Sequence, residues 1–268
     1  MRLPRLPDLL TTANLACGVA SILLASQGQL TWACGLVFIA AVFDVFDGLA
    51  ARAMGGGTPL GAQLDSLADM VSFGVAPAFI AFSLFDWNSV VSISDLLIAK
   101  DWPMSSTSAE PLNHKGHLLR YVVPILVVIP SAWRLAKFNL DTRQSSGFLG
   151  LPTPANGLFW ASIPLAIGTS LVQEGPMADL LQLGLLNFAR PVVAFSVALI
   201  LGILMLSELP LPGLKFKHFR WLGNQVIYVM AGLGTVLVVL YGILAVPLIL
   251  VLYVLSPLWG RVFPKAAS

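Results

Sequence analysis

Four aspartates between residues 44 and 69 carry the most chemical information in this sequence. Asp44, Asp47, Asp65 and Asp69 lie in a stretch whose surroundings are apolar enough to enter a bilayer. A carboxylate costs roughly 2.5–3.5 kcal/mol at the centre of a membrane helix, so acids at that depth indicate function. Four of them require a strong counter-charge, and hard oxygen ligands suit Mg²⁺, Mn²⁺ or Ca²⁺ better than zinc.

The spacing of these aspartates predicts two helical pairs. Asp44 and Asp47 are three residues apart and share one helix face, whereas Asp65 and Asp69 are four apart and share a face of the next helix. The run Gly-Gly-Gly-Thr-Pro at 55–59 breaks both helices and predicts a hairpin between them. We expect the two faces to meet and to hold two divalent ions, with positions left open for a diphosphate.

Glycine and arginine near the aspartates point towards phosphate. Gly48 follows Asp47, and a glycine inside a helix costs about 1 kcal/mol relative to alanine, which indicates that a ligand or helix approaches closely. Arg52 lies one turn further on the same face and can pair with a phosphate. The residues alone leave two alternatives open: aspartates that pair with arginines inside a bundle, and a cation channel or carrier.

The elements that must position these residues are membrane helices. The chain of 268 residues is 57% hydrophobic and 10% charged, whereas soluble domains carry about 25% charge. Its composition excludes a soluble domain, and nothing indicates nucleic-acid binding. Runs of about 20 apolar residues predict an all-α polytopic membrane helix bundle of eight spans, with seven as the alternative. The predicted spans are 9–28, 30–51, 65–85, 118–137, 155–174, 189–206, 223–240 and 242–258.

The distribution of charge orients this bundle. With the N-terminus in the cytoplasm, eight spans place eleven of the fifteen Lys and Arg on the cytoplasmic side, as the positive-inside rule requires. These are Arg2, Arg5, Arg52, Arg134, Lys137, Arg143, Lys215, Lys217, Arg220, Arg261 and Lys265; the outer four are Lys100, Lys115, Arg120 and Arg190. The polar segment 86–117 is then an outer loop, and the aspartates lie at the cytoplasmic end of the membrane.

The aspartate segment also resembles a known family. Asp44-x-x-Asp47-Gly48-x-x-Ala51-Arg52, followed after eight residues by Gly61-x-x-x-Asp65-x-x-x-Asp69, matches every fixed position of the CDP-alcohol phosphotransferase signature. Four other segments resemble the bacterial and archaeal phosphatidylserine synthases of that family: Thr11–Gly18, Ser66–Ala78, Arg134–Asn139 and Gly150–Ala155.

The resemblance implies an architecture and an activity. It implies one integral membrane domain over 1–268, with a six-helix core at 7–206 and a further helix pair at 223–258. The implied enzyme transfers the phosphatidyl group of CDP-diacylglycerol to the hydroxyl of L-serine and releases CMP, with two Mg²⁺ or Mn²⁺ ions. It would be a homodimer among the lipids of the bacterial cytoplasmic membrane, with its site facing the cytoplasm. Glycerol 3-phosphate or inositol is the alternative acceptor.

The same resemblance implies roles for individual residues. Asp44, Asp47, Asp65 and Asp69 would bind metal, and Asp69 would also be the general base. The residues expected to contact the CDP portion are Gly48, Arg52, Thr58, Gly61 and Asn14, although Asn14 could equally be a helix-capping residue. Arg134, Lys137 and Asn139 would bind serine; the alternative for the two cations is that they anchor the helix at the cytoplasmic surface.

Overall fold

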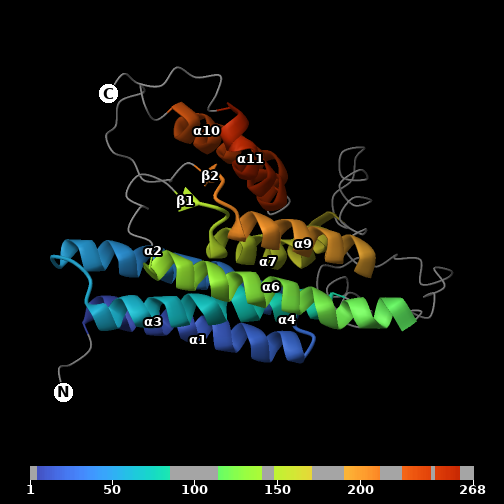
Figure 1. Ribbon diagram of the computed structural model, residues 1–268, viewed down its shortest axis with the longest axis horizontal. Helices are drawn as coiled ribbons and strands as arrows, with labels where there is room; N and C mark the ends of the chain where they lie inside the picture. Colours follow the sequence, from blue (N-terminus) through green and yellow to red (C-terminus); the bar gives the residue numbers. More distant parts are fainter. Residues whose placement is uncertain are drawn as a thin grey trace.

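The computed structural model describes residues 5–84, 114–140, 148–170, 190–211, 225–242 and 245–259 (Figure 1). The predicted outer loop 86–117 therefore lies outside the described residues as far as residue 113. So do several cations of the topology argument: Arg2, Lys100, Arg143, Lys215, Lys217, Arg220, Arg261 and Lys265.

A helix corresponds to each of the eight predicted spans. The helices are α1 (Leu6–Ser26), α2 (Leu30–Ala53), the continuous run α3 (Pro59–Asp69), η1 (Met70–Val75) and α4 (Ala76–Ser83), then α6 (His114–Leu140), α7 (Thr153–Ser170), α9 (Pro191–Leu206), α10 (Gln225–Tyr241) and α11 (Ala245–Trp259). Four are long and apolar enough to cross a bilayer: Leu6–Ser26, Leu30–Ala53, Pro59–Ser83 and Leu118–Leu140. The chain is a multi-pass membrane protein, and the prediction of a polytopic all-α bundle is confirmed.

Two predicted boundaries are wrong, because hydropathy marks the bilayer rather than the ends of a helix. The third helical run begins at Pro59, not at 65: the Thr58 hydroxyl accepts a hydrogen bond from the Gly61 amide at 2.9 Å, and proline occupies the first helical position. The helix α6 begins at His114, inside the segment predicted to be loop. Both extensions lie before the apolar runs from which the spans were predicted, so hydropathy alone does not reveal them.

The helices pack in two adjoining groups (Figure 1). The helix α1 lies along α2, α3, η1 and α4, and one buried cluster joins this group to α7 through side chains such as Val37, Phe73 and Ile80. A second cluster joins α6, α7, α9 and α11 around Trp160 and Met205. The helix α10 packs on α11, at the edge of the bundle in Figure 1. The aspartate hairpin therefore belongs to the first group.

A π-helical segment, η1, follows Asp69 directly and is held by two close approaches. A Cβ on Gly18 of α1 would lie 2.5 Å from Ser72 Oγ, and a Cβ on Gly157 of α7 would lie 2.8 Å from Phe73 Cα. Only glycine allows the neighbouring helices to come this near. Short π-helical segments are rare and often occur at functional sites.

One short strand pair, absent from the sequence interpretation, ties the start of α7 to the end of α9. The strand β1 (Phe148–Leu149) pairs antiparallel with β2 (Pro210–Leu211). Gly150 follows β1 with a φ of +81°, and its amide donates to the Leu209 carbonyl at 2.9 Å. A side chain is disfavoured at that backbone conformation, which explains a glycine here.

Candidate functional site

The turn between α2 and α3 sets the geometry of the aspartate hairpin. The helix α2 ends at Ala53, and Gly55 and Gly56 follow with φ of +87° and +114°. Glycine adopts such angles without the steric penalty of a Cβ, so the chain can reverse direction here. The predicted hairpin at 55–59 is thereby confirmed.

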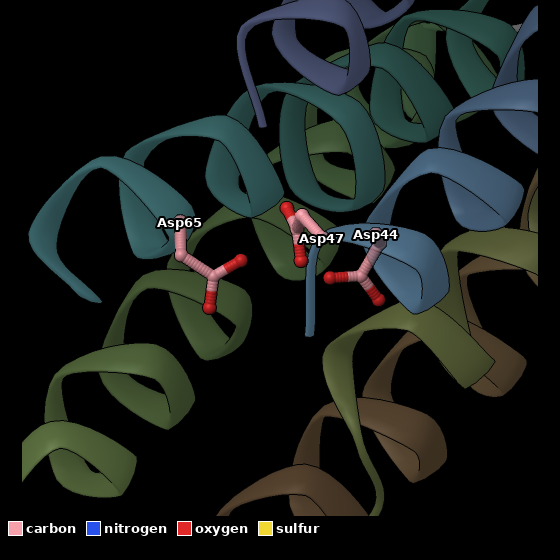
Figure 2. Close-up of side chains that lie close together, drawn as sticks. All are labelled: Asp44, Asp47 and Asp65. Atoms are coloured by element: carbon pink, nitrogen blue, oxygen red, sulfur yellow. The ribbon is translucent and has the colours of Figure 1, made fainter. Parts of the chain in front are cut away.

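The hairpin brings three of the four predicted aspartates together. Asp44 and Asp47 of α2 and Asp65 of α3 each offer a carboxylate oxygen, and these oxygens lie within 4.8 Å of one another (Figure 2). Asp47 is buried, and Asp44 and Asp65 are half-buried. Residues far apart along the chain thus form one compact set of anionic oxygen donors.

This set of carboxylates includes an oxygen atom that can accept a positively charged partner. Asp65 Oδ1 is buried without a hydrogen-bond partner in the described part of the chain. Among the described residues, the neighbouring charges that act on Asp44 and Asp65 include those of other aspartates. Aspartates that serve only to pair with arginines would be expected to have arginine charges beside them rather than other aspartates. The unpaired, clustered oxygens fit a hard divalent cation.

Asp69 adjoins the same cluster from the end of α3. It is 8% exposed and lies within electrostatic range of Asp44, Asp47 and Asp65. Its Oδ1 accepts a hydrogen bond from Asn14 Nδ2 of α1 at 3.1 Å. Asn14 was expected to contact the nucleotide or to cap a helix; in the structure its amide contacts Asp69.

A pocket of about 210 Å³ opens beside Asp47 and Asp65. Three residues expected to contact the CDP portion line it: Gly48, Thr58 and Gly61. The other lining residues are Arg5, Pro7, Asp8, Thr11, Ala51, Met54, Gly56, Gly57 and Ala62. Three of the five residues predicted to contact the CDP portion therefore line one cavity next to the carboxylates, and Asn14 and Arg52 are not among its lining residues.

Arg52 lies over Gly48 at the exposed end of α2. A Cβ built on Gly48 would be 3.6 Å from Arg52 Nη1, an ordinary van der Waals distance. The expected pairing of these two positions on one helix face is present. Arg52 is exposed at the rim of the site.

The three residues expected to bind serine differ in their surroundings. Arg134 is 4% exposed, and its Nε donates to the Leu151 carbonyl at 3.4 Å. Lys137 and Asn139 are exposed. Asn139 exchanges hydrogen bonds of 2.9 and 3.1 Å with Ser66, the residue after Asp65. The end of α6 thus reaches the aspartate hairpin through Asn139.

The sequence interpretation assigned no role to Thr11, which the structure places in the site. Thr11 is buried, and its hydroxyl donates to Asp47 Oδ2 at 2.7 Å. It lies one turn before Asn14, so the two share a face of α1. That spacing was the available signal, because it places both polar residues on one face of a largely apolar helix.

Comparison with known proteins adds independent findings. The sequence model of the family described as CDP-alcohol phosphatidyltransferase matches residues 5–163. The chain is 30% identical over 234 residues to a CDP-diacylglycerol–serine O-phosphatidyltransferase of Helicobacter pylori, covering 87% of this chain and 81% of the relative. It is 28% identical over 215 residues to the protein of that name from Methanocaldococcus jannaschii (80% and 77%). An archaetidylserine synthase of Methanothermobacter thermautotrophicus is 34% identical over 151 residues (56% and 53%).

Proposed function

This chain belongs to the CDP-alcohol phosphatidyltransferase family, and from that membership we propose that it transfers the phosphatidyl group of CDP-diacylglycerol to L-serine, giving phosphatidylserine and CMP. Relatives named for this reaction cover most of the chain. The observation that carries the proposal is the convergence of Asp44, Asp47 and Asp65 beside a pocket lined by Gly48, Thr58 and Gly61. This geometry supports the proposal, because clustered oxygen donors lie beside a pocket that the nucleotide would enter.

The aspartates would hold the divalent ions of the reaction. Asp44, Asp47, Asp65 and Asp69 supply only oxygen donors, which favour Mg²⁺ or Mn²⁺, and four carboxylates suffice for two ions. The unpartnered Oδ1 of Asp65 supports this assignment. When bound, such ions neutralise the diphosphate and stabilise the departing CMP.

The chain's own residues would bind the donor and accept the proton. Gly48, Thr58 and Gly61 line the nucleotide pocket, and Arg52 at its rim can pair bidentately with a phosphate oxygen pair. Asp69 accepts the proton of the serine hydroxyl as that oxygen forms its bond to the phosphatidyl phosphorus. The bond from this phosphorus to the CMP oxygen breaks, and CMP leaves with the electron pair. A positioned base of this kind contributes about 10²–10⁴-fold.

Serine would approach from the end of α6. Its carboxylate requires a cation, which Arg134 or Lys137 can supply, and its ammonium requires an acceptor such as the Asn139 amide oxygen. The contact between Asn139 and Ser66 supports this assignment, because it joins the end of α6 to the residue after Asp65. The acyl chains of the donor would remain in the bilayer.

The charge distribution favours a site that faces the cytoplasm, in the inner membrane of a bacterium. Relatives from bacteria support that location. We propose further that the chain is a homodimer, as the resemblance implies. Cross-linking in native membranes would test the assembly, and labelling of single cysteines introduced at Arg52 and Arg190 would test the orientation.

One assay tests the proposed reaction. Purified protein is supplied with CDP-diacylglycerol, Mg²⁺ or Mn²⁺, and serine, glycerol 3-phosphate or inositol in turn, and the released CMP is measured. CMP release that depends on serine supports the proposal. Release with another acceptor alone would overturn the choice of serine. Metal flux in vesicles without CMP release would identify a channel or carrier instead.

A further inference from the structure

Two polar side chains on one face of α1 reach two different aspartates. The Thr11 hydroxyl lies 2.7 Å from Asp47 Oδ2 and 3.0 Å from the Pro7 carbonyl, and its single proton forms the stronger bond with the charged carboxylate. Asn14 Nδ2 donates to Asp69 Oδ1 at 3.1 Å. The contacts span 36 and 55 positions of sequence, so both depend on how α1 is seated against the hairpin.

We propose that Thr11 and Asn14 are positioning residues of the transfer reaction. Thr11 fixes the Asp47 carboxylate in the orientation in which it holds metal. Asn14 orients Asp69 for proton transfer and does not contact the nucleotide. This inference rests on the proposed function, because it needs Asp47 as a ligand and Asp69 as the base.

The state of the Asn14 side chain argues against a role in packing alone. Asn14 is fully buried, and its Oδ1 has no hydrogen-bond partner among the described residues. A buried unsatisfied acceptor lowers stability, and an apolar side chain of the same shape would avoid that loss. The presence of an amide here is explained by its Nδ2 group, which holds the Asp69 carboxylate through a hydrogen bond.

The backbone of α1 is clamped to the same segment that carries Asp69. The Ser72 hydroxyl of η1 donates to the Asn14 carbonyl at 2.9 Å, while the Asn14 side chain donates to Asp69. Both hydrogen bonds connect Asn14 of α1 to residues 69–72, which lie within one helical turn. Gly18 lets the helices meet, since its Cβ would lie 2.9 Å from Ser72 Cα. The clamp therefore sets the position of the Asn14 amide relative to Asp69.

The test compares isosteric variants of the full-length protein. Thr11→Val removes the hydroxyl, Thr11→Ser keeps it, and Asn14→Leu removes the amide donor. Thr12→Val is the matched control, because the Thr12 hydroxyl is exposed and bonds the Asp8 carbonyl at 2.7 Å. Two quantities are measured: binding of Mn²⁺ without substrate, by the loss of free-ion signal in electron paramagnetic resonance, and kcat and KM from CMP release.

Loss of a side chain that hydrogen-bonds a metal ligand lowers metal affinity or activity by about 10–100-fold. We expect an effect of that size here. Thr11→Val should weaken Mn²⁺ binding by that factor, and Thr11→Ser should restore it. Asn14→Leu should lower kcat by that factor while the KM for CDP-diacylglycerol changes by less than about threefold. Thr12→Val should match the wild type in both.

If the wild-type protein is active, any one of three results would overturn the inference. Mn²⁺ affinity unchanged in Thr11→Val would remove Thr11 from the role. A KM increase in Asn14→Leu that accounts for the whole loss of kcat/KM would place Asn14 on the nucleotide. Equal defects in Thr12→Val would show that α1 packing alone is responsible. If Asn14→Leu does not fold, the smaller Asn14→Ala removes the same donor without adding an ionisable group. A wild type that releases no CMP with any acceptor refutes the proposed function instead.

Discussion

Replacing Gly48 with alanine should separate substrate binding from folding. Among the described residues, the added Cβ would meet only Arg52 Nη1 and Nη2, at 3.6 and 3.9 Å, so the helix has space for it there. Alanine also stabilises a helix interior by about 0.8–1 kcal/mol relative to glycine. The thermal unfolding temperature of Gly48→Ala in detergent should therefore equal or exceed that of the wild type.

Activity should change in the opposite direction. Gly48 lines the pocket beside Asp47, so under the proposed function a methyl group there would stand in the path of the diphosphate. Forcing one extra carbon into a filled site costs about 1–3 kcal/mol, which corresponds to roughly a 5–150-fold loss of kcat/KM. The measurement is CMP release at varied CDP-diacylglycerol.

Gly157→Ala is the matched control, because its Cβ would lie 2.8 Å from both Cα and the carbonyl oxygen of Phe73. Backbone atoms cannot turn aside as a side chain can, so this variant should lose about 1–3 kcal/mol of stability. A Gly48→Ala enzyme with wild-type kcat/KM would refute the idea that ligand approach requires this glycine. An unfolded Gly48→Ala would show that the position serves helix packing.

Three other perturbations test the proposed roles. Asp69→Asn should still bind CDP-diacylglycerol but lower turnover by at least about 10²-fold, and near-normal kcat would exclude Asp69 as the base. Removal of divalent ions with EDTA should abolish CMP release and added Mg²⁺ or Mn²⁺ should restore it, whereas undiminished release in EDTA would contradict a metal site. Lys137→Ala should raise the KM for serine more than that for CDP-diacylglycerol without changing the unfolding temperature, because this side chain is exposed; equal increases would remove Lys137 from the serine site.

The pairing of the aspartates could be predicted from sequence because its causes are local. Spacings of three and four residues place side chains on one helix face wherever the helix lies. Glycine at 55 and 56, followed by Thr58 and Pro59, marks a turn and a capped helix start through short-range backbone preferences. The turn brings α2 and α3 near each other, and Asp44, Asp47 and Asp65 come together in the structure.

The helical character of the apolar runs also follows from sequence, since a chain inside a bilayer must satisfy its backbone hydrogen bonds internally. The helices that start at Pro59 and His114 begin before the predicted apolar runs, because helix formation extends beyond an apolar run wherever capping or backbone bonding supports it. Hydropathy therefore located the spans more reliably than their ends.

The partners of the aspartates depended instead on how whole helices fit together. Contacts such as that of Gly18 with Ser72 determine which face of α1 turns towards the hairpin. That rotation of α1 brings Thr11 to Asp47 and Asn14 to Asp69. The burial of Arg134 and the exposure of Lys137, three residues apart in one motif, likewise reflect the packing of α6. Spacing along one helix is a property of that helix, whereas contacts between helices are chosen by side chains distributed over the whole bundle.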